Sequence, residues 1–169
     1  IIQGNHKSAT SQPATFDKML NKDVLYGFAL PVDKNIVIKI PKCMVQPGGI
    51  VQQLTLAPDG HRVPKERLTH DLSCARTGDD KSVNKRLDMD KYPPMFYGWC
   101  LLRVIHFIVA LRLAFPSERI LIAKFDFSAA YRRLTQSGVT AVLSVLISLQ
   151  VAYIYLRMTF GGAANPPAW

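Results

Sequence analysis

A tight turn in the first half of the chain restricts its fold more than any other sequence feature. The turn, APDG at residues 57–60, separates the segment IVQQLTL from a second, basic segment. Pro58 stands at the second turn position, where its ring fixes φ, and Asp59 and Gly60 tolerate the positive φ that a tight reversal requires. The pattern predicts a β-hairpin over residues 50–72. Its returning arm carries three basic residues, Arg62, Lys65 and Arg67.

The hairpin belongs to a chain with a large surplus of positive charge. The 169 residues carry a formal net charge of +9, and 49% of them are hydrophobic, which is typical of a globular domain. A surplus of Lys and Arg attracts the phosphate backbone of nucleic acids, because binding releases condensed counterions. Nucleic acid is therefore the expected class of partner, although charge alone also fits a basic surface that only confers solubility or one that binds an anionic membrane.

The three cysteines, Cys43, Cys74 and Cys100, are odd in number and widely spaced. This arrangement fits neither a disulfide framework nor a paired-cysteine zinc motif. We therefore expect reduced thiols and an intracellular location.

One stretch, residues 139–156, is close in length to a membrane span. Ser144, Ser148 and Gln150 interrupt it, however, and its last part, residues 151–156, is β-branched and aromatic like a buried strand. We predict a helix followed by a strand in a globular core, and no membrane segment.

Local patterns predict four further elements. We expect a poorly ordered leader over residues 1–23, which are mostly polar, and a strand over residues 35–40, where apolar residues alternate. Apolar residues at helical spacing predict a helix over residues 95–115, and a compact apolar run predicts a buried strand over residues 120–123. One face of the helix would carry Leu102, Ile105, His106, Val109 and Leu113.

Asp126 would follow directly after the last of these strands. Polymerases need carboxylates at strand ends, because two divalent cations must be held beside the primer 3′-hydroxyl and the incoming triphosphate. Asp126 is therefore a candidate catalytic residue and a candidate ligand of Mg²⁺ or Mn²⁺. Taken alone, it also fits the N-cap of a helix over residues 128–134.

The sequence around Asp126, FDFSAAYR at residues 125–132, resembles the first palm motif of reverse transcriptases. In that family the metal-binding Asp is followed five positions later by an aromatic residue, which lies under the sugar of the incoming nucleotide and excludes a 2′-hydroxyl. Tyr131 matches that aromatic residue. The resemblance implies that Asp126 binds the metal and Tyr131 the nucleotide, while a half-buried core aromatic is the alternative for Tyr131.

An upstream segment, KERLTHDLS at residues 65–73, is similar to the fingers motif of the same family. There a basic residue four positions before an Asp grips the triphosphate, a task that suits the planar fork of arginine. Arg67 matches this residue, and Lys65 is a second candidate contact to template or phosphate. We interpret four nearby or intervening polar residues as structural: Asp71 and Asn84 as hydrogen-bonding residues, and His70 and His106 as satisfied histidines.

A downstream segment, MTFGGAANPPAW at residues 158–169, resembles the family's Pro-Phe-Gly motif, which ends in Asn-Ala-Pro. Small residues there let the backbone approach the templating base and the nucleotide closely. The resemblance implies that Phe160 and Gly161 contact the nucleotide. Thr159 departs from the pattern, because it replaces the usual Pro.

Together the three motifs imply an α+β fold, with a β-hairpin and helices packed on an incomplete antiparallel sheet. Residues 24–116 would form a fingers-like region and residues 117–169 a partial palm. The implied activity is metal-dependent, RNA-directed DNA synthesis. The implied partners are deoxynucleoside triphosphates and an RNA or DNA template with its primer.

The family's second catalytic motif, a pair of Asp residues on a hairpin, has no match in this chain. Asp79 and Asp80 are adjacent, but they precede the palm motif and lie in a polar loop. We therefore expect the chain to end before the second motif and to be inactive by itself. The alternative is a non-catalytic nucleic-acid-binding protein, derived from a retroelement, that uses the basic hairpin.

Overall fold

A computed structural model describes the chain over residues 4–75, 82–92, 94, 98–123, 125, 127 and 129–163. Three groups of residues with predicted roles lie outside the described residues: Asp126, the pair Asp79 and Asp80, and residues 164–169. The chain divides into two compact units, residues 1–92 with 129–169, and residues 93–128.

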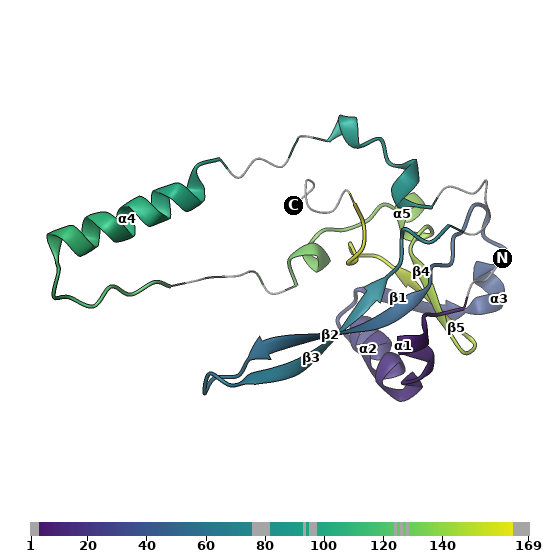
Figure 1. Ribbon diagram of the computed structural model, residues 1–169. Helices are drawn as coiled ribbons and strands as arrows, with labels where there is room; N and C mark the ends of the chain where they lie inside the picture. The colour runs from purple at the N-terminus through teal and green to yellow at the C-terminus, as the bar shows by residue number, and fades with distance from the viewer. Residues whose placement is uncertain are drawn as a thin grey trace. The chain divides into compact units, whose positions relative to one another are not determined.

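The first unit has two antiparallel sheets, one with the strand order β1-β5-β4 and one formed by β2 and β3 (Figure 1). Its strands are β1 (Ala29–Asp33), β2 (Gly48–Leu56), β3 (Arg62–His70), β4 (Val145–Ser148) and β5 (Val151–Tyr155). Its α-helices are α1 (Lys7–Thr10), α2 (Pro13–Leu25), α3 (Lys34–Val37) and α5 (Gly138–Ala141), and its 3-10 helices are η1 (Asn84–Arg86), η2 (Met89–Lys91) and η3 (Ala130–Arg133). The predicted α+β class is confirmed.

The three-stranded sheet is buried on both faces. Successive side chains of a strand point to opposite faces, so Tyr153 and Tyr155 of β5 lie on one face and Ala152 on the other. The first pair packs in a core cluster with Phe16 and Leu20 of α2, while Ala152 belongs to a second cluster with residues of α3 and β4. The short central strand β5 therefore links the two clusters.

Helix α2 shows that the predicted leader over residues 1–23 is wrong for its larger part. Pro13 stands at the start of the helix, where its missing N–H leaves no hydrogen bond unmade. Phe16 and Leu20, one helical turn apart, are 2% and 0% exposed. Burial of these two side chains against the sheet stabilises a segment whose composition is mostly polar.

The predicted strand over residues 35–40 is also wrong. The side chain of Asp33 accepts a hydrogen bond of 2.7 Å from the backbone N–H of Asn35, and this cap begins helix α3. The strand lies just before it, as β1. Val37 is fully buried, whereas Ile36 and Ile38 are both 57% exposed, so the alternation reflects one buried helical residue rather than a strand face.

The predicted hairpin is confirmed, with β2 and β3 paired from Gly48 opposite His70 to Leu56 opposite Arg62. Its proximal end is buried, since Ile50 belongs to the core cluster that contains Phe16. Its distal half is exposed and extends away from α2 and the three-stranded sheet (Figure 1).

The stretch over residues 139–156 forms α5, β4 and β5. The predicted strand at its end is confirmed by β5, but the predicted helix ends after one turn, at Ala141. β4 and β5 then pair as a hairpin, with Ser148 opposite Val151. None of the helices in the described part of the chain is long and apolar enough to span a bilayer.

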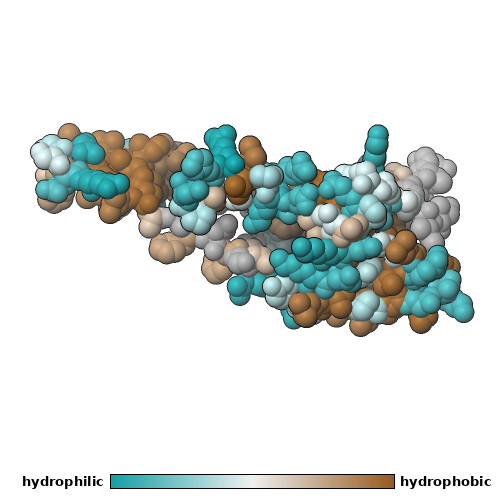
Figure 2. Space-filling view, turned by 90° about the horizontal axis from the view of Figure 1, so that it is seen from below, coloured by the Kyte–Doolittle hydropathy of each residue, from teal (hydrophilic) through white to brown (hydrophobic). Residues whose placement is uncertain are grey.

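The second unit contains helix α4 (Cys100–Ala114), which confirms the predicted helix over its described part. Apolar side chains gather over this helix in Figure 2, and Leu101, Phe107 and Leu113 are each more than 70% exposed. Its end is held by Arg112, whose Nη1 donates to the carbonyl oxygens of Pro116 and Glu118 at 3.0 and 3.1 Å.

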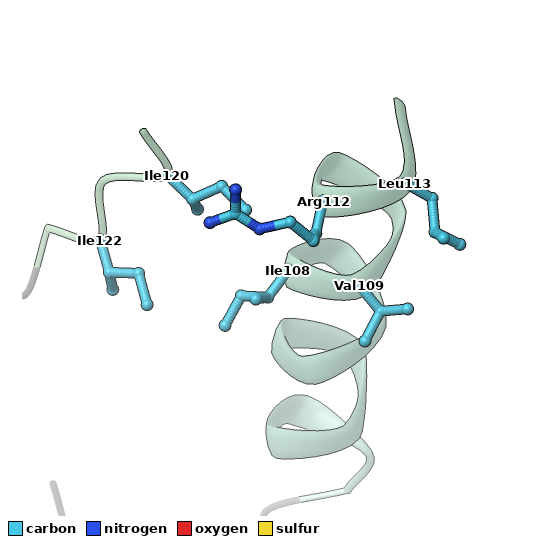
Figure 3. Close-up of a pocket in the computed structure, with 6 residues that line it drawn as sticks. All are labelled: Ile108, Val109, Arg112, Leu113, Ile120 and Ile122. Carbon is cyan, nitrogen blue, oxygen red and sulfur yellow. The ribbon is translucent and has the colours of Figure 1, made fainter. Parts of the chain in front are cut away.

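The predicted buried strand over residues 120–123 is wrong. These residues form no regular secondary structure, and Leu121 and Ile122 are 77% and 70% exposed. A strand needs a neighbour to satisfy its backbone groups, and the described residues of the second unit include no strand. Ile120 and Ile122 instead line an apolar hollow beside α4 with four helix residues, Ile108, Val109, Arg112 and Leu113 (Figure 3).

Candidate nucleotide site

Three predicted site residues from separate parts of the sequence meet in the first unit. The guanidinium carbon of Arg67 lies 5.8 Å from the centre of the Phe160 ring, within the range of a cation–π contact. The Tyr131 ring meets Phe160 edge to face, with ring centres 5.4 Å apart. Arg67, Phe160 and Tyr131 form the cluster that we call the aromatic–arginine site.

Strand β3 brings Arg67 to this site. Arg67 pairs with Val51 in the hairpin ladder and is half-buried. Its Nε atom is buried and has no hydrogen-bond partner among the described residues. Within the same residues, no carboxylate forms an ion pair with it. An arginine held over an aromatic ring and lacking an acidic partner is suited to an anionic ligand.

Lys65 lies on the same face of β3 as Arg67, because residues two apart in a strand share a face. It is exposed and pairs with Gln53 in the distal half of the hairpin. Lys65 is therefore a neighbour of Arg67 on the strand and not a member of the aromatic–arginine site.

Gly161 turns the chain immediately after Phe160. Its φ of +107° lies in the region that favours glycine, and a Cβ at this position would overlap the carbonyl oxygen of His70. The sequence predicted a close backbone approach at this glycine, with the nucleotide as the neighbour. In the structure, the neighbour is the backbone at the end of β3.

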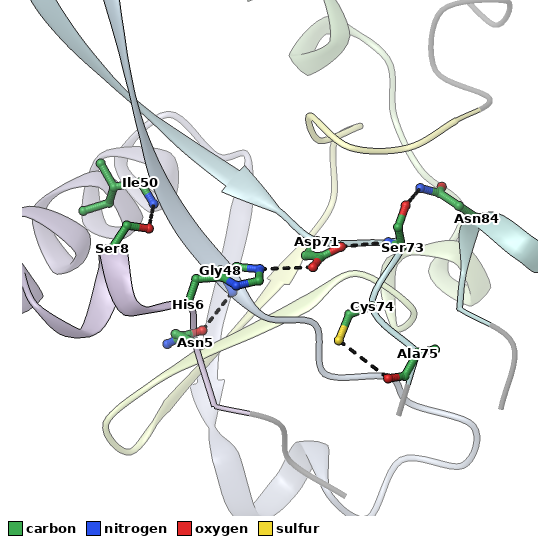
Figure 4. A network of polar contacts seen from close by, with 10 residues as sticks. All are labelled: Asn5, His6, Ser8, Gly48, Ile50, Asp71, Ser73, Cys74, Ala75 and Asn84. Atoms are coloured by element: carbon green, nitrogen blue, oxygen red, sulfur yellow. Dashed lines mark hydrogen bonds and ion pairs between the residues drawn. The ribbon is translucent and has the colours of Figure 1, made fainter. Parts of the chain in front are cut away.

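Asn84 holds the Gly161 turn against the segment that follows β3. Its Nδ2 donates to the carbonyl oxygen of Gly161 at 2.7 Å and to Ser73 Oγ at 2.8 Å, and its Oδ1 accepts from the N–H of Ala163 at 2.9 Å. In the same network, Asp71 accepts from the N–H of Ser73 and contacts His6 (Figure 4). The prediction that Asp71 and Asn84 are structural hydrogen-bonding residues is confirmed.

The residue after Tyr131 belongs to a buried polar cluster. Arg132, the next residue of η3, forms an ion pair of 2.8 Å with Asp23 of α2, and the hydroxyl of Tyr155 donates to the same carboxylate at 3.0 Å. Burial raises the pKa of Asp23, an effect that the nearby charge of Arg132 and the Tyr155 hydrogen bond only partly oppose. Burial, followed by the charge of Asp23, raises the pKa of Tyr155 well above its ordinary value.

His70 completes this cluster from β3. Its ring meets Tyr155 edge to face at 4.2 Å, and it is 3% exposed. Burial, and then the charge of Arg132, lower its pKa well below the ordinary histidine value, so the ring is neutral at pH 7. The prediction that His70 is a satisfied histidine is contradicted, because neither ring nitrogen has a hydrogen-bond partner among the described residues. His106 is an exposed residue of α4.

Sequence reasoning missed Asp23, although one signal marks it. Phe16, Leu20 and Asp23 follow the spacing i, i+4, i+7, which places an acid in the apolar stripe of a helix. An acid at such a position is buried and needs a cationic partner. The sequence alone does not indicate that the partner is Arg132.

No metal site is evident in the described residues, which contain no cluster of three or more His, Cys, Asp or Glu side chains that could hold an ion. Asp126, the predicted ligand, lies outside them. The described geometry suits an anionic ligand at the aromatic–arginine site.

Comparison with models of protein families, with curated proteins and with solved structures yields no match to this chain.

Proposed function

We propose that the chain is part of a polymerase of the reverse-transcriptase class, in which the aromatic–arginine site holds the incoming deoxynucleoside triphosphate. The observation that carries the proposal is the contact of Phe160 with both Arg67 and Tyr131. The three residues belong to three separate motifs of the sequence. Their meeting in one unit is what a shared ligand would require.

Each residue has a distinct role in the proposed complex. Arg67 donates charge-assisted hydrogen bonds to the triphosphate, and its cation–π contact with Phe160 restricts where the guanidinium lies. Tyr131 lies under the sugar and disfavours a 2′-hydroxyl. The Phe160–Gly161 turn supplies backbone close to the nucleotide.

The proposed reaction is template-directed nucleotidyl transfer in a longer protein that also carries the second acidic motif. Asp126 would hold Mg²⁺ or Mn²⁺, which would supply charge stabilisation to the transferring phosphate. Template and primer would be held by Lys and Arg contacts to phosphate, in keeping with the net charge of +9. In that protein Asp126→Asn should abolish primer extension and leave duplex binding nearly unchanged, whereas retained extension would refute the metal-ligand role.

Nucleotide binding by the 169-residue chain tests the site directly. Titration calorimetry with dGTP and Mg²⁺ should show binding that Arg67→Ala weakens about tenfold or more, because charged hydrogen bonds contribute about 1.5–3 kcal/mol each. The dGTP affinity of Arg67→Lys should lie between those of the unaltered chain and Arg67→Ala, since lysine keeps the charge but loses the planar fork.

Arg62→Ala is the matched control. It removes the same charge from the same strand, but at the exposed distal end of the hairpin. It should leave dGTP affinity within about twofold, which is less than 0.5 kcal/mol. Equal losses for Arg62→Ala and Arg67→Ala would indicate a diffuse charge effect and contradict a nucleotide site at Arg67.

The second candidate function is non-catalytic binding of nucleic acid through the hairpin. The exposed distal half of the hairpin, which carries Arg62 and Lys65, favours it. In that case single-stranded RNA or DNA should bind the chain, dGTP should not, and Arg62→Ala and Lys65→Ala should each weaken binding and reduce its salt dependence.

A further inference from the structure

The Asp23–Arg132 ion pair joins helix α2 to the residue next to Tyr131. Arg132 Nη2 lies 2.8 Å from Asp23 Oδ2, and the two side chains are 8% and 15% exposed. The pair spans 109 positions in the sequence. It is therefore a long-range contact between α2 and η3 within the first unit.

Arg132 is the buried anchor of η3. This 3-10 helix is only four residues long, follows a residue with a φ of +53° (Ala129), and has Arg132 as its one buried residue. The Arg132 guanidinium also lies over the rings of Tyr155 and Phe28, at 4.8 and 5.7 Å. The contacts of this one buried side chain therefore contribute to the orientation of η3, together with the backbone bridge between Thr135 and Arg157 that follows it.

Tyr131 precedes Arg132 directly, so the two Cα atoms are about 3.8 Å apart and a rotation of η3 moves both side chains together. The Tyr131 ring faces Phe160, while the Arg132 guanidinium faces Asp23. Displacement of Arg132 would consequently change the position of the Tyr131 ring on Phe160.

We propose that Asp23 is a positioning residue for Tyr131: by fixing Arg132, it holds the Tyr131 ring against Phe160 and so sets the discrimination between deoxyribose and ribose. The effect on sugar discrimination rests on the proposed nucleotide function, whereas the effect on the ring contact does not. The polar cluster around the pair supports an indirect role, because the Tyr155 hydroxyl also donates to Asp23 and restricts where the carboxylate lies.

The test compares two acids of the same helix. Asp23→Asn keeps the shape of the side chain but removes the charge that binds Arg132. Asp17→Asn is the matched control, because Asp17 also ties α2 to the sheet, through a hydrogen bond of 2.6 Å from Ser148 Oγ, but does not contact η3.

The first measurement is the nuclear Overhauser effect between the Tyr131 and Phe160 rings, in variants whose fold is verified by circular dichroism. We expect Asp23→Asn to weaken this signal strongly and Asp17→Asn to leave it unchanged. An unchanged signal in Asp23→Asn would overturn the proposal. So would an equal loss in both variants, because that result indicates a general loosening of α2.

The second measurement is the ratio of the affinities for dGTP and GTP. Asp23→Asn should reduce the preference for dGTP at least about fivefold, which corresponds to about 1 kcal/mol, and should have no further effect in a Tyr131→Ala background. Independent effects of the two changes would contradict positioning through Tyr131.

The two proposals fail in distinguishable ways. If the unaltered chain binds neither nucleotide, the proposed function is overturned, and the ring contact alone decides whether Asp23 positions Tyr131. If Asp23→Asn does not fold, Asp23→Ser takes its place, because it also removes the charge that pairs with Arg132. It should weaken the ring contact, and an unchanged contact would overturn the proposal.

Discussion

Gly161 lies directly against the backbone of His70, so that a Cβ on Gly161 would overlap the His70 carbonyl oxygen. Because His70 is the last residue of β3 and Gly161 follows Phe160, this approach joins the strand that carries Arg67 to the turn that carries the Phe160 ring. The aromatic–arginine site therefore depends on a position that only glycine can occupy.

Gly161→Ala should destabilise the first unit by more than about 3 kcal/mol, since a positive φ costs a side-chain residue about 1–3 kcal/mol and the overlap adds to it. The midpoint of urea unfolding measures the change. Gly60→Ala is the control, because Gly60 also has a positive φ, +87°, but no atom within 4 Å of the added Cβ. Similar losses for the two variants would show that the contact with His70 is not the cause.

Gly48, the first residue of β2, is a second position where a side chain cannot fit. A Cβ there would lie 2.6 Å from Cζ of Phe16, a ring that is 2% exposed. Gly48→Ala should lower the free energy of unfolding by about 1–3 kcal/mol, the usual cost of overpacking a core. Thermal unfolding followed by circular dichroism measures it.

The neighbouring Gly49 provides the matched control. Its added Cβ would lie 3.1 Å from Thr69 Oγ1 and near two other polar side chains, which can shift. Gly49→Ala should therefore cost less than Gly48→Ala. Adding Phe16→Leu to Gly48→Ala should cost less than the sum of the two single changes, and strict additivity would show that the Phe16 ring is not the obstacle.

Local sequence chemistry predicted those parts of the fold that local chemistry determines. The hairpin follows from Pro58 and the Asp59-Gly60 pair, whose backbone preferences act over four residues. The failures depend on other residues. Residues 35–40 do not form the expected strand, because a cap from Asp33 begins helix α3 there. Residues 120–123 have no neighbouring strand among the described residues of their unit.

The site divides in the same way. Arg67, Tyr131 and Phe160 could be selected because each stands in a motif with defined spacing, and the structure brings them together. Asp23 could not be paired with Arg132, because 109 positions separate them and no local pattern encodes the contact. Motif spacing identifies the residues that face a ligand, whereas the residues that hold them depend on tertiary packing.

Asn84 should hold the Gly161 turn through its three hydrogen bonds to Ser73, Gly161 and Ala163. Asn84→Ala should cost about 1 kcal/mol, because the side chain is only partly buried and water can replace it. The sharper result is faster hydrogen exchange at the Ala163 amide, which loses its acceptor. Asn35→Ala, an exposed change on α3, should leave that exchange rate unchanged, and slow exchange at Ala163 in Asn84→Ala would contradict the anchoring role.

His70 should make the stability of the fold depend on pH. Burial lowers its pKa in the folded chain well below the ordinary value of about 6.5, which the unfolded chain retains. As pH falls through 6.5, the unfolded state takes up a proton that the folded state does not, so the free energy of unfolding decreases. The contribution is fully present above about pH 6.5 and is lost by up to about 1.4 kcal/mol per pH unit below it.

Urea unfolding between pH 7.5 and 5.5 measures how the free energy of unfolding changes with pH. His70→Phe should reduce this slope by the contribution of about one proton, and it keeps an aromatic ring against Tyr155. Groups that titrate in both the unaltered chain and His70→Phe cancel when the two slopes are compared. Asp23 is one of them, and its raised pKa makes the free energy of unfolding increase as pH falls. The slope of the unaltered chain is the reference for this comparison. If His70→Phe has that same slope, His70 takes up its proton in the folded chain as readily as in the unfolded one, and the buried neutral ring is excluded.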